Sequence, residues 1–284
     1  MSRQCRSSSV SRIATRVLLW YARHVPHHKG KQRLSDYLRG VFGVELEGET
    51  VERRGGFWWC LDPGDYICQD VYWSGAKDRA EIREALRSMR RGSVMLDVGA
   101  NFGYYSVVIA ARFGQQCTIH AFEPNPLIFA RLHKNLKLNG AAAVVPHQVG
   151  LSDQEGTAAI VDVPGHSGAV YLRPGSGVAV TSLDLFVRRQ GLEDVDLIKI
   201  DAEGAELRIL RGARGILERF RPNILIELNA PTLERENSSI SEVIALLRSL
   251  GYRIFSINPR REILADSNRL PRAVMNVLCT VKPR

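Results

Sequence analysis

The feature that most constrains the fold is an alternation that begins at Val94, in which short apolar runs of strand length are followed by segments with helical periodicity. Strands are expected at 94–98, 118–122, 143–149, 197–200, 224–228, 252–257 and 274–281, and helices at 104–113, 126–138, 183–190, 205–220 and 240–250. Neighbouring parallel strands need a long crossover between them, and that crossover is usually a helix. The alternation therefore predicts an α/β fold, a doubly wound and mostly parallel sheet with helices on both faces.

The positive charge of the chain is concentrated at its N-terminus. Residues 1–40 hold nine Lys or Arg and one acid, Asp36, whereas the other 244 residues hold 30 basic and 29 acidic residues. Because the body is nearly neutral, the net charge of +9 does not indicate a nucleic-acid-binding domain, and no nucleic-acid partner is expected. Ile13, Val17 and Trp20 recur at helical spacing within this basic segment. An amphipathic helix on an anionic membrane surface, an organellar transit peptide and an ordinary solvated or packed helix all remain open.

A small β-rich region separates this extension from the alternating pattern. Gly55-Gly56 is a turn signal before the strand-like run Phe57–Leu61, and residues 78–91 have the pattern of an amphipathic helix. We therefore divide the chain into a basic extension (1–40), a β-hairpin and helix region (41–92) and a main domain (93–284). The apolar run 17–22 is too short to span a bilayer, and five cysteines without a C-x-x-C pair favour a reduced, cytoplasmic protein, either free or peripheral to the membrane.

A glycine-containing turn follows the first strand of the main domain. Asp97 lies at the strand end, and Gly99 and Gly103 flank the turn before the next helix. Ligands of open α/β sheets bind beyond the carboxyl ends of the strands. The Gly-x-x-x-Gly spacing is not the dinucleotide fingerprint, and no phosphate-binding G-K-[ST] follows. A carboxylate here would repel a diphosphate but suits an ammonium group, which indicates S-adenosylmethionine as the cofactor.

Glu123 ends the second strand, 20 residues beyond Gly103. A carboxylate at this strand tip can accept hydrogen bonds from both hydroxyls of a ribose. The alternative is an acid that complements the dipole of the helix beginning near Pro126. Because Asp97 and the glycines lie just upstream, we favour ribose binding.

Five segments together resemble one known family. They are Asp97–Gly103 (DVGANFG), Phe122–Pro126 (FEPNP), Val149–Asp153 (VGLSD), Thr181–Asp184 (TSLD) and Ile198–Glu206 (IKIDAEGAE). In this order they resemble the FkbM family of S-adenosylmethionine-dependent methyltransferases, over roughly residues 55–281. The last segment is the most specific of the five, and Ala202 in it stands where valine is frequent.

The resemblance implies a Rossmann-like sheet of about seven strands, the last antiparallel, and O-methylation of a sugar or natural-product hydroxyl. It places Asp97, Gly99, Asn101 and Gly103 at the cofactor. Ser152 and Asp153 become candidates for hydrogen bonds to adenine, although a polar turn would explain the same residues.

The carboxylates after the fourth and fifth strands are the catalytic candidates. Asp201 and Glu203 should lie near the transferred methyl, where a general base would take the proton of an attacking hydroxyl. Glu227 interrupts an apolar strand and either binds substrate, pairs with a basic group, or joins Asp201 and Asn229 around Mg²⁺. We favour a site without metal. Glu206 is interpreted as helix N-terminal charge, and Lys199 as a partner for a nearby carboxylate.

Two histidines complete the set of candidates. His120 is expected to be a core residue, and His166 is a weak candidate for a base. The function that fits best is O-methylation of a small-molecule, glycolipid or glycan acceptor. A methyltransferase acting on nitrogen or on a macromolecule, and a non-catalytic cofactor-binding module, are the alternatives.

Overall fold

The computed structural model describes residues 9–25, 30–42, 48–162, 170–263 and 274–281. The described residues form two compact units, one up to Lys77 and one from Asp78 onward.

The first unit contains two helices, a hairpin and a third helix. They are α1 (Ser9–His24), α2 (Lys31–Phe42), β1 (Thr50–Arg54), β2 (Phe57–Leu61) and α3 (Tyr66–Ser74). The predicted hairpin is confirmed, because β1 and β2 pair antiparallel across Gly55-Gly56. Helix α3 was not predicted from the sequence; Asp65 caps it by accepting a hydrogen bond from the Ile67 N–H. Its Trp73 is fully buried, as is Trp59 of β2.

The second unit is built on an eight-stranded sheet. Its strands are β3 (Ser93–Val98), β4 (Cys117–Phe122), β5 (Val144–His147), β10 (Leu197–Ile200), β11 (Asn223–Leu228), β12 (Arg253–Ile257), β13 (Arg260–Glu262) and β14 (Met275–Thr280). The order across the sheet is β13-β12-β14-β11-β10-β3-β4-β5. Strands β5, β4, β3, β10 and β11 are parallel, and β14 is antiparallel between β11 and β12. The predicted Rossmann-like sheet with an antiparallel last strand is thus confirmed, with a short additional strand, β13, at the edge.

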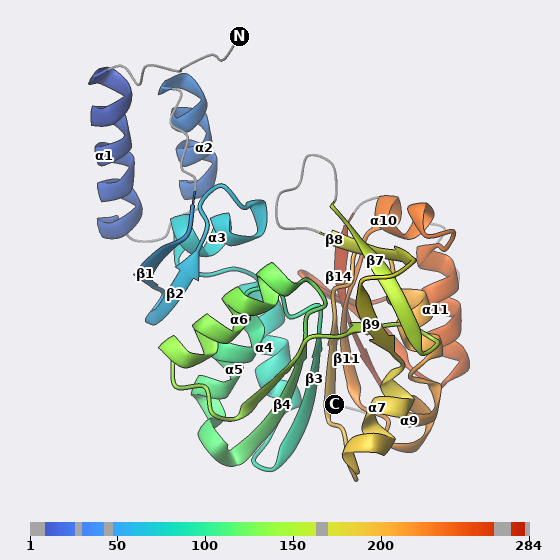
Figure 1. Ribbon diagram of the computed structural model, residues 1–284. Helices are drawn as coiled ribbons and strands as arrows, with labels where there is room; N and C mark the ends of the chain where they lie inside the picture. The colour runs from blue at the N-terminus through green and yellow to red at the C-terminus, as the bar shows by residue number, and fades with distance from the viewer. Residues whose placement is uncertain (1–8, 26–29, 43–47, 163–169, 264–273, 282–284) are drawn as a thin grey trace. The chain divides into compact units, whose positions relative to one another are not determined.

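Helices cover both faces of this sheet (Figure 1). One face carries α4 (Arg79–Ser88), α5 (Tyr104–Phe113) and α6 (Pro126–Leu138). The other carries α7 (Leu183–Gln190), α8 (Glu206–Arg211), α9 (Arg214–Arg219) and α11 (Ile240–Ser249), whose apolar side chains share one core with the strands. A 3-10 turn, η1 (Gly114–Gln116), follows α5, and α10 (Ala230–Arg235) follows β11.

The single helix expected at 205–220 is wrong, because it is broken at Gly212 into α8 and α9. A Cβ at Gly212 would lie 2.2 Å from the Ser152 carbonyl oxygen, so the chain passes too close for any larger residue. The Asp184 carboxylate then accepts hydrogen bonds from the Gly215 and Ile216 N–H groups at 2.8 and 2.9 Å. These contacts start α9 as a separate helix.

A second, four-stranded sheet lies between β5 and α7 in the sequence. It consists of β6 (Gly150–Leu151), β7 (Gly156–Asp162), β8 (Val170–Pro174) and β9 (Val178–Thr181), in the order β6-β9-β7-β8. The strand expected at 143–149 therefore stops at His147, and the chain enters this second sheet at Gly150. Ala158, Val178 and Val180 form its small apolar cluster.

Candidate functional site

The turn after β3 is held against the loop after β10. Gly99 has a φ of +70°, and a Cβ there would lie 1.8 Å from the Asp201 carbonyl oxygen. The Gly99 and Ala100 N–H groups donate to the Phe122 carbonyl at 3.1 and 2.9 Å. Only glycine allows this approach, so the turn brings the ends of β3, β4 and β10 together.

Asp97 is completely buried beneath this turn. Its Oδ2 accepts a hydrogen bond from the Ser106 hydroxyl at 2.6 Å, while its Oδ1 has no hydrogen-bond partner within the described part of the chain. Burial raises the pKa of Asp97, and the Lys199 charge opposes that rise. A buried acceptor without a donor is costly, which makes Oδ1 a candidate contact for a ligand.

Glu123 connects the glycine turn with the start of α6. Its Oε2 accepts from the Asn101 N–H at 3.1 Å, and its Oε1 accepts from the Asn125 N–H at 2.9 Å. Burial raises the pKa of Glu123 to about 7. The N-cap of α6 is Asn125, whose side chain accepts from the Leu127 N–H, so Glu123 is not needed as the cap. Ribose binding by Glu123 stays a prediction.

The other side of the turn is fixed by α6. Asn135, fully buried on this helix, donates from its side-chain amide to the Phe102 carbonyl at 2.8 Å. Gly103 has a φ of +90°, and a Cβ there would lie 2.6 Å from a Leu132 methyl group. Asn101 also has a positive φ, of 50°, which asparagine tolerates better than most residues. The four predicted turn residues therefore lie in one rigid segment.

Lys199 has a larger part in the site than the sequence indicated. Its ammonium group lies 3.2 Å from Asp201 Oδ2 and 3.3 Å from the Gly99 carbonyl oxygen, and it stands over the Tyr105 ring. The predicted pairing with a carboxylate is confirmed. The lysine therefore connects the glycine turn with the loop of Asp201. The sequence held a signal for this contact, because a charged residue between Ile198 and Ile200 is buried and a buried lysine needs polar partners.

The loop after β10 contains the remaining predicted carboxylates. The Asp201 side chain is 28% exposed, in contrast to the buried Asp97 and Glu123. Glu203 has a φ of +52°, an uncommon conformation for a residue other than glycine, and its carbonyl accepts from Arg235 of α10. Glu206 folds back so that its Oε1 accepts from the Ala202 and Gly204 N–H groups, both at 3.1 Å. Glu206 thus lies at a helix start as predicted, but it organises the loop.

Comparison with known proteins assigns the family. The family model of the methyltransferase FkbM domain matches residues 97–254, which are more than half of the chain and include the glycine turn, Glu123 and the loop after β10. The chain belongs to the FkbM methyltransferase family. Relatives include methyltransferase sdnD of Sordaria araneosa, 30% identical over 56% of this chain and 73% of that protein. The 31-O-demethyl-FK506 methyltransferase FkbM of Streptomyces tacrolimicus is 27% identical over 66% and 82%. The hexuronic acid methyltransferase AglP of Haloferax volcanii is 27% identical over 52% and 61%.

Glu227 of this FkbM methyltransferase lies one strand away from Asp201. Ile200 of β10 is in register with Ile226 of β11, so the next positions, Asp201 and Glu227, are neighbours at the carboxyl ends of these strands. Glu227 is half-buried and faces Asn276 of β14 in the antiparallel register. Among the described residues, no group of three His, Cys, Asp or Glu side chains has a metal-binding arrangement.

Ser152 and Asp153 occupy a different environment from the glycine turn. The Ser152 N–H donates to the Thr181 carbonyl at 3.0 Å, and its hydroxyl donates to the Asp153 carboxylate at 3.0 Å. Their backbone packs on Gly212 at the break between α8 and α9. These contacts fit the polar-turn alternative, and adenine binding stays a prediction.

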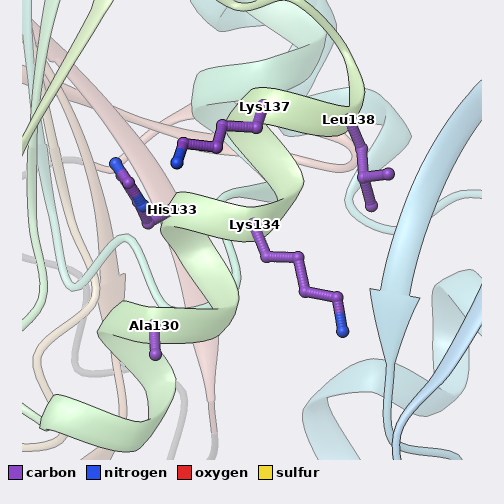
Figure 2. Close-up of a pocket in the computed structure, with 5 residues that line it drawn as sticks. All are labelled: Ala130, His133, Lys134, Lys137 and Leu138. Carbon is purple, nitrogen blue, oxygen red and sulfur yellow. The ribbon is translucent and has the colours of Figure 1, made fainter.

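A surface pocket of about 380 Å³ lies along α6 (Figure 2). Its lining residues are Ala130, His133, Lys134, Lys137 and Leu138, none of which is a candidate for the methyl-transfer site.

His120, predicted as a core residue, is buried, and its Nδ1 lies 3.0 Å from Nε2 of His147. Burial lowers the pKa of both rings. His166 lies outside the described residues.

Proposed function

We propose that this FkbM-family chain transfers a methyl group from S-adenosylmethionine to a hydroxyl oxygen of a sugar or natural-product acceptor. The supporting observation is the excess of carboxylates at the glycine turn. The pKa values of Asp97 and Glu123 are both raised by burial, and the charge of Asp201 raises them further, although Lys199 acts in the opposite direction. Both pKa values stay raised despite the charge of Lys199, so an added positive charge would stabilise the ionised carboxylates.

The residues present fit this cofactor. S-adenosylmethionine carries an ammonium group, a sulfonium and two ribose hydroxyls, and it supplies an activated methyl group. The unpartnered Oδ1 of Asp97 can accept from an ammonium donor, directly or through water, and the Glu123 carboxylate can accept from ribose hydroxyls. The glycine turn and Asn101 would bring backbone groups close to the same ligand.

Asp201 is the residue best placed to handle the acceptor. It is the most accessible of the three carboxylates around the turn, and Lys199 fixes its orientation through the contact with Oδ2. We assign Asp201 the role of accepting the hydroxyl proton, with Glu203 and Glu227 orienting the acceptor from the adjacent loop and strand. Proton removal by a positioned side chain contributes roughly 10²–10⁴-fold to rate.

Two relatives support oxygen as the methyl acceptor. By their names, one acts on a hexuronic acid and the other on the 31-O position of a demethylated FK506. Because one name gives a sugar acid and the other an oxygen position, we infer an oxygen acceptor for this chain as well.

The test is transfer of labelled methyl from S-adenosylmethionine to a panel of uronic-acid glycans, glycolipids, polyketide-type alcohols and amines. We expect methyl ethers as products and a loss of about 10²-fold or more in turnover for Asp201→Asn. The matched control is Glu218→Gln, which removes a surface carboxylate paired with Arg214 of the same helix and should keep full turnover. Labelling confined to amines, or equal turnover of Asp201→Asn and wild type, would contradict the proposal.

A further inference from the structure

The first unit exposes apolar side chains along two of its helices. On α1, Ile13, Val17 and Trp20 are 64%, 58% and 58% exposed. Their spacing of four and three residues places them on one face of the helix. Leu18, outside that face, is only 2% exposed. Helix α1 therefore buries Leu18 on one side and exposes an apolar face on another.

Helix α2 repeats this arrangement. Leu34, Tyr37 and Val41 recur at intervals of three and four residues and are 42%, 68% and 57% exposed. Helices α1 and α2 pack against each other (Figure 1). Of the thirteen large apolar side chains that are well exposed among the described residues, nine lie in the first unit, although it is the smaller of the two. Such a concentration is typical of an interaction surface, since scattered single residues would be the ordinary arrangement.

The charge of the same segment favours one kind of partner. Residues 1–40 carry a net charge of +8, and α1 contains three arginines and no acid. Arg16 and Arg33, on α1 and α2, are both exposed. The exposed faces also carry Trp20 and Tyr37, the two residue types that favour the boundary between hydrocarbon and headgroups. Among the described residues, no helix is long and apolar enough to cross a membrane.

From this combination we propose that the exposed faces of α1 and α2 bind an anionic lipid bilayer as an interfacial anchor. Apolar side chains would enter the headgroup region, while arginines would interact with lipid phosphates. A protein partner with an apolar groove would require acidic residues around that groove, whereas an anionic bilayer supplies both the apolar layer and the negative charge.

The experiment is sedimentation of the full chain with vesicles of phosphatidylcholine containing 30% phosphatidylglycerol, compared with pure phosphatidylcholine. We expect binding to the anionic vesicles that weakens at least tenfold when salt rises from about 0.1 to 0.5 M. Quenching of Trp20 fluorescence by brominated lipid, absent in Trp20→Phe, would locate the contact on α1. Equal binding to both vesicle types, or no binding to either, would overturn the proposal.

Variants separate the apolar and the charged contributions. Val17→Ser and Trp20→Ser should each weaken vesicle binding at least tenfold, and Arg16→Gln and Arg33→Gln about fivefold each. The matched control is Leu127→Ser, which removes an 80% exposed leucine from the second unit and should leave vesicle binding unchanged. All variants should keep the wild-type melting temperature. Loss of binding by Leu127→Ser, or unchanged binding by Trp20→Ser, would contradict the assignment.

A second copy of this chain is the competing occupant, and sedimentation velocity distinguishes it. If the protein formed dimers that Trp20→Ser dissociated in the absence of lipid, the exposed faces would be a self-association surface and the lipid proposal would be wrong. We expect the same sedimentation coefficient for both proteins.

Discussion

Replacement of Glu123 by Gln should separate its structural contacts from its contacts with the cofactor. The carboxylate accepts one backbone N–H on each oxygen, from Asn101 and Asn125, and is 4% exposed. Glutamine keeps the volume and one acceptor oxygen, so one buried N–H loses its acceptor at a cost of about 1–3 kcal/mol. At roughly 2–4 °C per kcal/mol, we expect the melting temperature to fall by several degrees without loss of the fold.

The effect on the cofactor should be larger and should depend on pH. Loss of a charge-assisted hydrogen bond from a ribose hydroxyl is worth about 1.5–3 kcal/mol, so affinity for S-adenosylhomocysteine should fall roughly 10–100-fold at pH 8. Because the pKa of Glu123 is about 7, wild-type protein loses the charged acceptor as the pH falls through that value. Its affinity should be about tenfold lower at pH 6 than at pH 8, whereas Glu123→Gln should lack this dependence.

Isothermal titration of S-adenosylhomocysteine at both pH values, with melting curves of the same samples, measures the two effects. The control is Asn135→Ala, which removes a hydrogen bond to the same turn, from Asn135 to the Phe102 carbonyl, without removing a carboxylate. It should lower the melting temperature and keep the tenfold pH dependence. If Glu123→Gln instead lowered the melting temperature and left affinity and its pH dependence as in wild type, Glu123 would only join the two turns.

Three further predictions follow from the same site. S-adenosylhomocysteine should raise the melting temperature and NAD should not, because Gly99 to Gly103 lack the dinucleotide spacing. A thermal-shift assay in which NAD, and not S-adenosylhomocysteine, stabilises the protein would exclude the cofactor assignment. Gly99→Ala should lower the free energy of unfolding by at least about 3 kcal/mol, measured with denaturant, because the new Cβ meets the Asp201 carbonyl. Gly191→Ala, also at positive φ but in open space, should lower it by about 1–2 kcal/mol. Equal losses of stability in the two variants would show that the contact is unimportant. Burial raises the pKa of Glu206 from 4.5 to about 7, so between these pH values the folded protein retains a proton that the unfolded chain loses. The free energy of unfolding therefore falls as the pH rises through this range, and Glu206→Gln should remove this fall. Parallel pH profiles of unfolding for the variant and wild type would contradict the reasoning.

Local pattern was sufficient for most of the large sheet. The helices at 104–113, 126–138 and 183–190 have the bounds that periodicity predicts. Asn125 and Ser182 cap the second and third of these through short-range contacts with backbone N–H groups. The break at Gly212 was not predictable in this way, since residues 205–220 have continuous helical periodicity. Its cause is the backbone of Ser152, sixty residues earlier in the sequence.

The candidate site shows the same division between local and distant contacts. The sequence identified Asp97, Glu123 and Asp201 from their positions at the ends of strands, and the structure brings these strand ends together. The sequence did not indicate that Glu123 would accept hydrogen bonds from two backbone N–H groups, or that Lys199 would contact the glycine turn. Both contacts depend on the side-by-side placement of β3, β4 and β10, which sets distances that periodicity does not contain.

The four-stranded sheet between β5 and α7 has a consequence for how this enzyme could diversify. Within the described residues its strands pair with one another, and Ala158, Val178 and Val180 form an apolar cluster apart from the large core. Residues inserted between β7 and β8 would therefore lengthen one hairpin without shifting the register of β3, β4 or β10. Loop exchange at this point could add new surface, while β3, β4 and β10, whose ends hold Asp97, Glu123 and Asp201, kept their pairing.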